Sequence, residues 1–161
     1  FAIQVEALEA RRLAEPFEAL RDRADAHTKS SGAAPSVFLA NIGRLADFKA
    51  RAGFAQNLFE SGGIQALPGE GYTSAADAVK AFKASGTSIA CLCSSDALYG
   101  EHAADFGKAL KDAGAKLIFL AGNPGEARAA YEAAGVSHFI HVGTNVLEAL
   151  AEAQDALGVP A

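Results

Sequence analysis

Short apolar runs alternate with longer amphipathic stretches from Pro35 onward. This alternation is typical of βαβ units, in which helices connect the strands of a parallel sheet. Several runs are apolar on both faces, as buried parallel strands must be. The chain is therefore predicted to fold over residues 36–158 as one α/β domain with five parallel strands. The five runs are SVFLA (36–40), IQAL (64–67), SIACLC (88–93), KLIFLA (116–121) and HFIHV (138–142).

The stretches between these runs carry helix start and stop signals. In the first, an apolar stripe ends at the glycine pair 62–63. A third helix is expected over residues 99–113. Five such units with right-handed crossovers favour a flavodoxin-like (Rossmann-like) sheet of order 2-1-3-4-5, whose ligand site lies at the carboxyl ends of strands one and three. The stripe consists of Leu45, Phe48, Ala52, Ala55 and Phe59, and the expected caps of the other helices are Thr73 or Ser74, Asn123 and Asn145.

Residues 1–35 are predicted to form an N-terminal helical arm and linker. PFEALRDRADA predicts a short helix with Pro16 at its first position and with Phe17, Leu20 and Ala24 on its apolar face. The following HTKSSGAAP has the composition of a linker. Because the chain begins at Phe1 and contains no methionine, we expect it to be the C-terminal piece of a longer protein.

The net charge of −5, with acidic and basic residues mixed along the chain, argues against nucleic acid as a partner. No apolar run approaches the roughly 18 residues of a membrane span, and no signal peptide is evident. We therefore expect no membrane association and a cytoplasmic location.

Cysteines and histidines give no pattern typical of a metal or catalytic site. Cys91 and Cys93 should point to one face of a strand as buried thiols. His138 and His141 should point to opposite faces of the last strand and so cannot share a metal. We expect the serines of CSSDALYGEH to cap the following helix instead of forming a Ser-His-Asp site, because the G-x-S-x-G motif is absent.

The loop at residues 41–48 lacks the hydroxyl groups and glycine motifs of a phosphate cradle, which disfavours FMN. A two-component receiver domain would end strand three with an aspartate, where this chain has Cys93. A free-standing small-molecule sensor would need a polar pocket that the loops do not supply.

Several long phrases resemble one family. AEPFEALRDRADA, PSVFLANIGRLADFKARAGFAQNLFESGGIQA, ACLCSSDALYG and LKDAGAKLIFLAG look like the C-terminal region of the small (beta) subunit of bacterial methylmalonyl-CoA mutase. The resemblance implies an upstream TIM barrel that is absent here, with residues 1–35 as the connecting arm. Residues 36–161 would be a degenerate cobalamin (B12)-binding-like domain.

Active cobalamin-binding domains of this family carry D-x-H-x-x-G, whose histidine is the lower cobalt ligand and is oriented by the aspartate. Aligned from Gly63 backwards, the histidine position falls at Phe48 and the aspartate at Ala46, and no histidine occurs between His27 and His102. By resemblance, the rest of a vestigial cofactor pocket corresponds to Ser94, Gly122, Gly143 and Thr144. Asn123 and Pro124 replace the second glycine and fill space that the nucleotide tail needs.

The resemblance implies a non-catalytic domain that binds no cofactor and has no metal or catalytic residues. It would support the large (alpha) subunit, which carries adenosylcobalamin and interconverts methylmalonyl-CoA and succinyl-CoA. The alternative is a functional corrinoid-binding domain that takes base-on cobalamin, which needs no protein histidine and would use the same four pocket residues.

Overall fold

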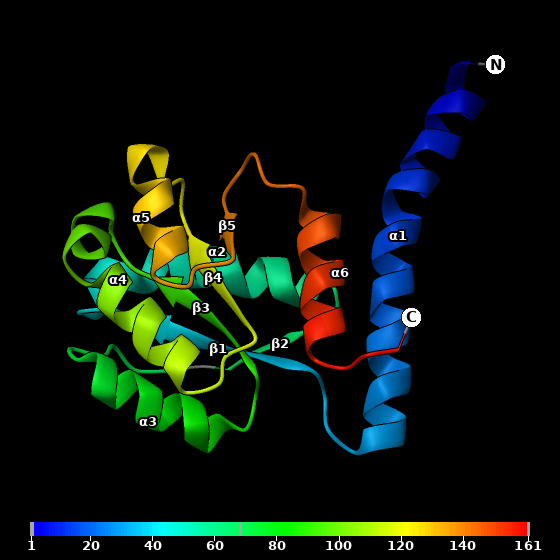
Figure 1. The fold of residues 1–161 in the computed structure, drawn as a ribbon. Helices are drawn as coiled ribbons and strands as arrows, with labels where there is room; N and C mark the ends of the chain where they lie inside the picture. The colour runs from blue at the N-terminus through cyan, green and yellow to red at the C-terminus, as the bar shows by residue number, and fades with distance from the viewer. Residues whose placement is uncertain (1, 68, 161) are drawn as a thin grey trace.

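Five parallel strands form one sheet in the order β2-β1-β3-β4-β5, which confirms the predicted flavodoxin-like topology (Figure 1). The computed structural model describes residues 2–67 and 69–160, with side chains from residue 15 onward. Each strand lies within one of the five predicted runs or extends it by one residue, because these runs are the segments with enough apolar surface to be buried on both faces. The strands are β1 (Ser36–Asn41), β2 (Gln65–Leu67), β3 (Ile89–Cys93), β4 (Leu117–Ala121) and β5 (His138–Ile140).

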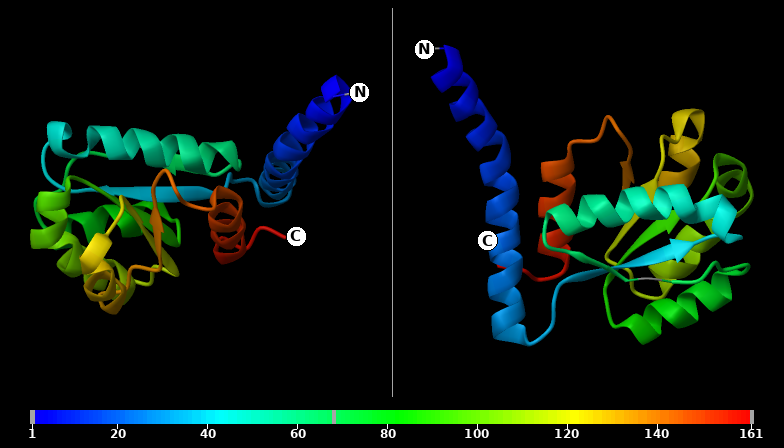
Figure 2. Two further views of the ribbon diagram at one scale, coloured as in Figure 1. Left: turned by 90° about the horizontal axis from the view of Figure 1, so that it is seen from above. Right: turned by 180° about the vertical axis from the view of Figure 1, so that it is seen from behind.

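Helices cover both faces of the sheet (Figure 2). One face packs against α2 (Leu45–Ser61) and α6 (Val146–Ala156), and the other packs against α3 (Ala75–Ser85), α4 (Asp96–Asp112) and α5 (Arg128–Ala133). Each face has its own buried core, and Phe59 and Phe106 lie at 0% and 2% exposure in the two cores. The predicted stripe on α2 is buried at Phe48, Ala55 and Phe59 and half-buried at Ala52, whereas Leu45 is exposed on the first turn.

Side-chain caps begin three of these helices. The predicted caps Ser74 and Asn145 accept hydrogen bonds from the backbone N–H groups of Asp77 and Glu148. The third helix, α4, begins at Asp96 and not at residue 99, because the Ser95 side chain caps it. After Asn123 the chain forms a short 3₁₀ turn over Gly125–Ala127 before α5, so Pro124 is not the first residue of an α-helix as predicted.

The N-terminal arm differs from the prediction. Helix α1 runs without interruption over Ala2–Ser31, so Pro16 lies inside it and the expected linker starts only after Ser31. Proline signals a helix start because it lacks an N–H donor, but here the helix continues through Pro16 with that donor missing. The predicted apolar face of its C-terminal half is confirmed, since Leu20 and Ala24 are buried and Phe17 is half-buried.

Helix α1 lies beside α6, at the outer edge of the layer that contains α2 (Figures 1 and 2). Its close approach to the turn after α2 depends on Gly63, where an added Cβ would lie 2.6 Å from the Ala24 Cβ. The buried amide of Gln154 on α6 donates to the carbonyls of Leu20 and Gly62, at 2.8 and 3.0 Å. One side chain thus connects α1, α6 and the turn after α2.

The thiols of Cys91 and Cys93 are buried on one face of β3, as predicted, with 3.9 Å between the sulfur atoms. Burial raises the pKa of the Cys91 thiol well above its ordinary value. Among the described helices, none combines the length and hydropathy that crossing a lipid bilayer requires.

Gly63→Ala should destabilise the chain by about 2 kcal/mol or more, because the new methyl group meets Ala24 and the residue has a φ of 76°. Gly53→Ala is the matched control, since a Cβ there meets nothing within 4 Å on helix α2. It should stabilise the chain by about 0.5–1 kcal/mol. Urea denaturation followed by circular dichroism measures both. Equal midpoints for the two variants would contradict the packing described for α1.

Candidate functional site

The four residues assigned by resemblance to a cofactor pocket all lie at the carboxyl edge of the sheet. Ser94 follows β3, Gly122 follows β4, and Gly143 and Thr144 follow β5. This is the edge at which α/β folds bind ligands, and the chain reverses its strand order here between β1 and β3. Topology therefore brings these residues to one edge of the sheet.

Ser94 and Tyr99 form buried contacts with the backbone around them. The Ser94 hydroxyl donates to the Ile42 carbonyl at 2.7 Å, and Ser94 is fully buried. The Tyr99 hydroxyl accepts from the Ser94 N–H at 2.9 Å and lies 2.7 Å from the Ala121 carbonyl. Burial raises the pKa of Tyr99 far above its ordinary value, so the hydroxyl keeps its proton. The hydroxyls of both side chains are therefore hydrogen-bonded to backbone groups of this chain.

Arg51 reaches from α2 over the ends of β3 and β4. Its Nη1 atom donates to the Ser94 carbonyl at 3.0 Å and to an Asp96 carboxylate oxygen at 2.8 Å, and the guanidinium lies over the Tyr99 ring. Burial by itself lowers the pKa of Arg51, but the hydrogen bond to Asp96 and its charge outweigh this and raise it. The side chain therefore stays cationic and bound to the loop after β3.

The lack of a side chain at Gly122 leaves the space that the Arg51 guanidinium occupies. An added Cβ at Gly122 would lie 3.0 Å from Arg51 Nη1, and the residue has a φ of 148°, which favours glycine. Beside them is a hollow of about 250 Å³ between α2 and the loops after β4 and β5. Its described lining residues are Ala50, Arg51, Phe54, Ala121, Gly122, Asn123, Ile140, His141 and Val142.

The loop after β5 closes on itself through Thr144. The Thr144 hydroxyl accepts from the His141 N–H at 2.7 Å and donates to the Phe139 carbonyl at 3.1 Å. The N–H of Gly143 donates to His141 Nδ1 at 3.1 Å. Gly143 and Thr144 thus shape the turn, and the Thr144 hydroxyl is used within it.

Phe48 and Ala46 occupy the positions at which the resemblance places a histidine and an aspartate. Phe48 is 6% exposed and packs within the core beneath α2, where its ring lies against Gly71. Ala46 is exposed on the first turn of α2. The Phe48 side chain is therefore surrounded by hydrocarbon.

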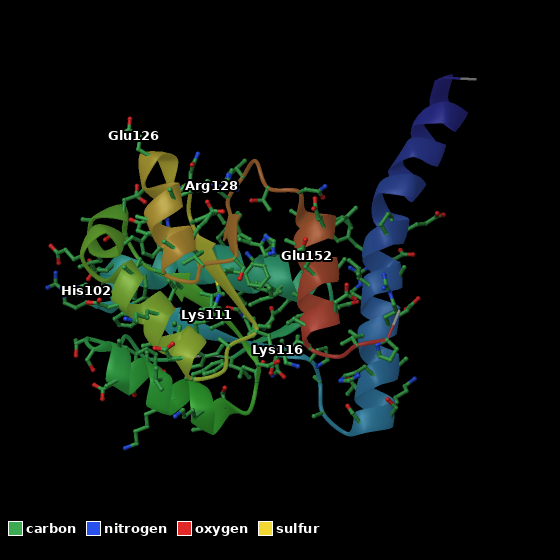
Figure 3. The ribbon with its side chains drawn as sticks, in the orientation of Figure 1. His102, Lys111, Lys116, Glu126, Arg128 and Glu152 are labelled. Atoms are coloured by element: carbon green, nitrogen blue, oxygen red, sulfur yellow. The ribbon has the colours of Figure 1, made fainter. Side chains whose placement is uncertain are left out.

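His138 and His141 border one hollow of about 200 Å³, so the prediction that they face opposite ways is wrong. Strand β5 ends at Ile140 and the chain turns at His141, so strand alternation does not apply. Figure 3 shows Glu152 on α6, where its carboxylate contacts His138 Nε2. Among the described residues, no three His, Cys, Asp or Glu side chains are grouped to hold a metal ion.

The residues of CSSDALYGEH do not form a Ser-His-Asp arrangement. His102 lies on the outer part of α4 and contacts Glu101, whereas Ser94 is buried against Ile42 (Figure 3). Ser95 caps α4 through its side chain, as expected for a capping serine, and Asp96 binds Arg51.

Three curated relatives carry the same name. The methylmalonyl-CoA mutase small subunit of Streptomyces virginiae is 42% identical over 145 residues, which is 90% of this chain and 22% of that protein. The small subunits of Propionibacterium freudenreichii subsp. shermanii and Porphyromonas gingivalis are 38% and 37% identical, over 92% and 96% of this chain and 23% and 24% of theirs. The resemblance to the methylmalonyl-CoA mutase small subunit is confirmed. The chain spans less than a quarter of the length of these small subunits.

Solved structures share the fold alone. A two-component response regulator from Clostridium difficile has a TM-score of 0.52 at 12% identity, over 77% of this chain and 96% of that chain. A response regulator receiver protein from Burkholderia phymatum has a TM-score of 0.51 at 19% identity, over 79% of this chain and 98% of that chain. No protein-family model matches the chain.

Sequence reasoning missed Arg51 and the structural role of Tyr99. It searched the loops after the strands, as the ligand sites of this fold suggest, whereas Arg51 lies on a helix and reaches those loops with a long side chain. The available signal was the helical spacing of Arg51 from Phe48, which puts both on the side of α2 that faces the sheet.

Tyr99→Phe should lower the free energy of unfolding by about 1–3 kcal/mol, because the Ser94 N–H and the Ala121 carbonyl lose a buried partner. Tyr131→Phe is the control, since Tyr131 is half-buried and its hydroxyl makes no hydrogen bond to the described residues. That change should stay within about 0.5 kcal/mol. Thermal or urea unfolding of the two variants tests this. A Tyr99→Phe protein as stable as the parent would refute the role given to the hydroxyl.

Proposed function

We propose that this chain is the C-terminal, cofactor-free cobalamin-binding-like domain of a methylmalonyl-CoA mutase small subunit. Its role is to support the large subunit in a heterodimer by burying surface against it. The large subunit would carry adenosylcobalamin and interconvert methylmalonyl-CoA and succinyl-CoA in the cytoplasm. The sequence identity to small subunits over nine tenths of the chain supports the placement in this enzyme.

The environment of Phe48 is the observation that supports a domain without a cofactor. Cobalt coordination needs a nitrogen donor at the open edge, and the position that the resemblance gives to histidine holds a phenyl ring packed in the core. The carboxylate that would orient a ligand histidine is missing too, because the corresponding position holds Ala46. The residues present do not fit a corrinoid whose cobalt is held by a side chain.

Arg51 extends the same argument to the mouth of the pocket. In the alignment that pairs Phe48 with the histidine of D-x-H-x-x-G, the glycine of that motif falls at Arg51. A residue without a side chain is replaced by a guanidinium that lies on Gly122 and binds the loop after β3. The polar groups of Ser94 are hydrogen-bonded within this chain, and this also weighs against base-on cobalamin.

Hydroxocobalamin should not bind the chain. A titration followed by desalting should leave a colourless protein, whereas the large subunit treated in the same way should keep its visible absorbance. The base-on alternative predicts that the protein keeps its colour. It also predicts that free imidazole does not change the number of cobalamin molecules bound per chain. Retained colour at one equivalent would overturn the cofactor-free proposal.

The chain should associate with the large subunit when both are mixed at micromolar concentration. A modest domain interface gives a dissociation constant on the order of micromolar. Mixing the two and running size-exclusion chromatography should show an earlier shared peak. A two-component receiver domain, which has the same fold, is the control and should elute alone. Separate elution of this chain from the large subunit would count against direct support of the partner by this domain.

A further inference from the structure

The hollow beside Arg51 is lined by hydrogen-bond donors and by apolar side chains. Both hydrogen bonds that Arg51 makes to the described residues start from Nη1, so Nε and Nη2 remain for another partner. These two atoms form the edge of a guanidinium that binds the two oxygens of a carboxylate. Arg51 lines the hollow, so this edge is the first element of an anion site.

Two further donors line the same hollow. His141 Nδ1 accepts from the Gly143 N–H, so the proton of the neutral ring is on Nε2, which is a donor. Asn123 Oδ1 accepts from the Gly125 N–H, which leaves the Asn123 Nδ2 group as a donor. No aspartate or glutamate is among the described residues that line the hollow. An acceptor-rich, negatively charged group is therefore favoured.

The apolar lining of the hollow defines the rest of the ligand. Phe54 on the wall and Val142 at the rim supply apolar surface, and the volume of about 250 Å³ suits a small molecule. The hollow also continues into an apolar groove of about 530 Å³ that shares Phe54, His141 and Val142 with it. A phosphate ion would leave these apolar surfaces uncovered, whereas a short aliphatic carboxylate covers them.

We infer that this hollow binds a short-chain aliphatic carboxylate. The carboxylate lies against the Nε and Nη2 atoms of Arg51, with Asn123 and His141 as further donors, and the aliphatic part lies on Phe54 and Val142. The inference is independent of the proposed partner, because it depends only on groups within this chain.

Isobutyrate is the probe, and isobutyramide is its neutral counterpart of the same shape. In a ¹H–¹⁵N titration of the 161-residue chain at constant ionic strength, isobutyrate should shift the amides of Gly122, Asn123 and Val142 in a saturable way. The dissociation constant should be on the order of millimolar, as a small ligand with one ion pair gives. Isobutyramide should bind at least about tenfold more weakly. Equal binding of the two, or no saturable shift with isobutyrate, would overturn the inference.

Variants at Val142 test the site without disturbing the core, because this residue is 97% exposed. Val142→Asp places a carboxylate at the rim and should abolish isobutyrate binding, whereas Val142→Asn should keep most of it. Arg51→Lys retains the charge but loses the two-atom edge and should weaken binding about tenfold. Lys49→Ala removes a cation from an exposed position of the same helix and should leave binding unchanged. A similar response to Val142→Asp and Val142→Asn would contradict an anion at this place.

Discussion

The hydroxyl of Tyr99 connects the ends of the two neighbouring strands β3 and β4, and the carboxyl edge is organised around it. It contacts the Ser94 N–H and the Ala121 carbonyl, each of which would otherwise lose a buried hydrogen-bond partner. The ring of the same residue supports the guanidinium of Arg51. Because α4 carries Tyr99 and Asp96 and α2 carries Arg51, the two helical layers meet at this edge through the contacts of Arg51 with these two residues.

This arrangement changes what the edge can bind. In an α/β fold of this topology, the backbone groups after the strands are commonly left for a ligand. Here the Ser94 carbonyl is used by Arg51, the Ser94 hydroxyl by Ile42, and the Thr144 hydroxyl by its own turn. The groups that remain free lie farther along, between α2 and the loop after β5, where the lining is mostly apolar.

The strand runs and most helix ends could be predicted because they depend on local signals. Buried parallel strands require apolar residues on both faces, and the caps Ser74 and Asn145 bond within their own first turn. The site was less predictable. The contact of Arg51 with Asp96 joins residues 45 positions apart, and no local pattern identifies such a pair. The predicted start of α1 was wrong because Pro16 was taken as the first helical residue, whereas the helix begins at Ala2 and continues through Pro16.

The bridge made by Gln154 has a consequence for how the polypeptide matures. Its amide joins carbonyls 134 and 92 positions earlier in the chain, so the contact between α1 and α6 closes only after α6 has been synthesised. Before α6 is made, Leu20 and Ala24 lack the side chains of α6 that pack near them, although the central strands of the sheet are already present. A ribosome-bound intermediate would therefore present an apolar helix face to chaperones until α6 has emerged.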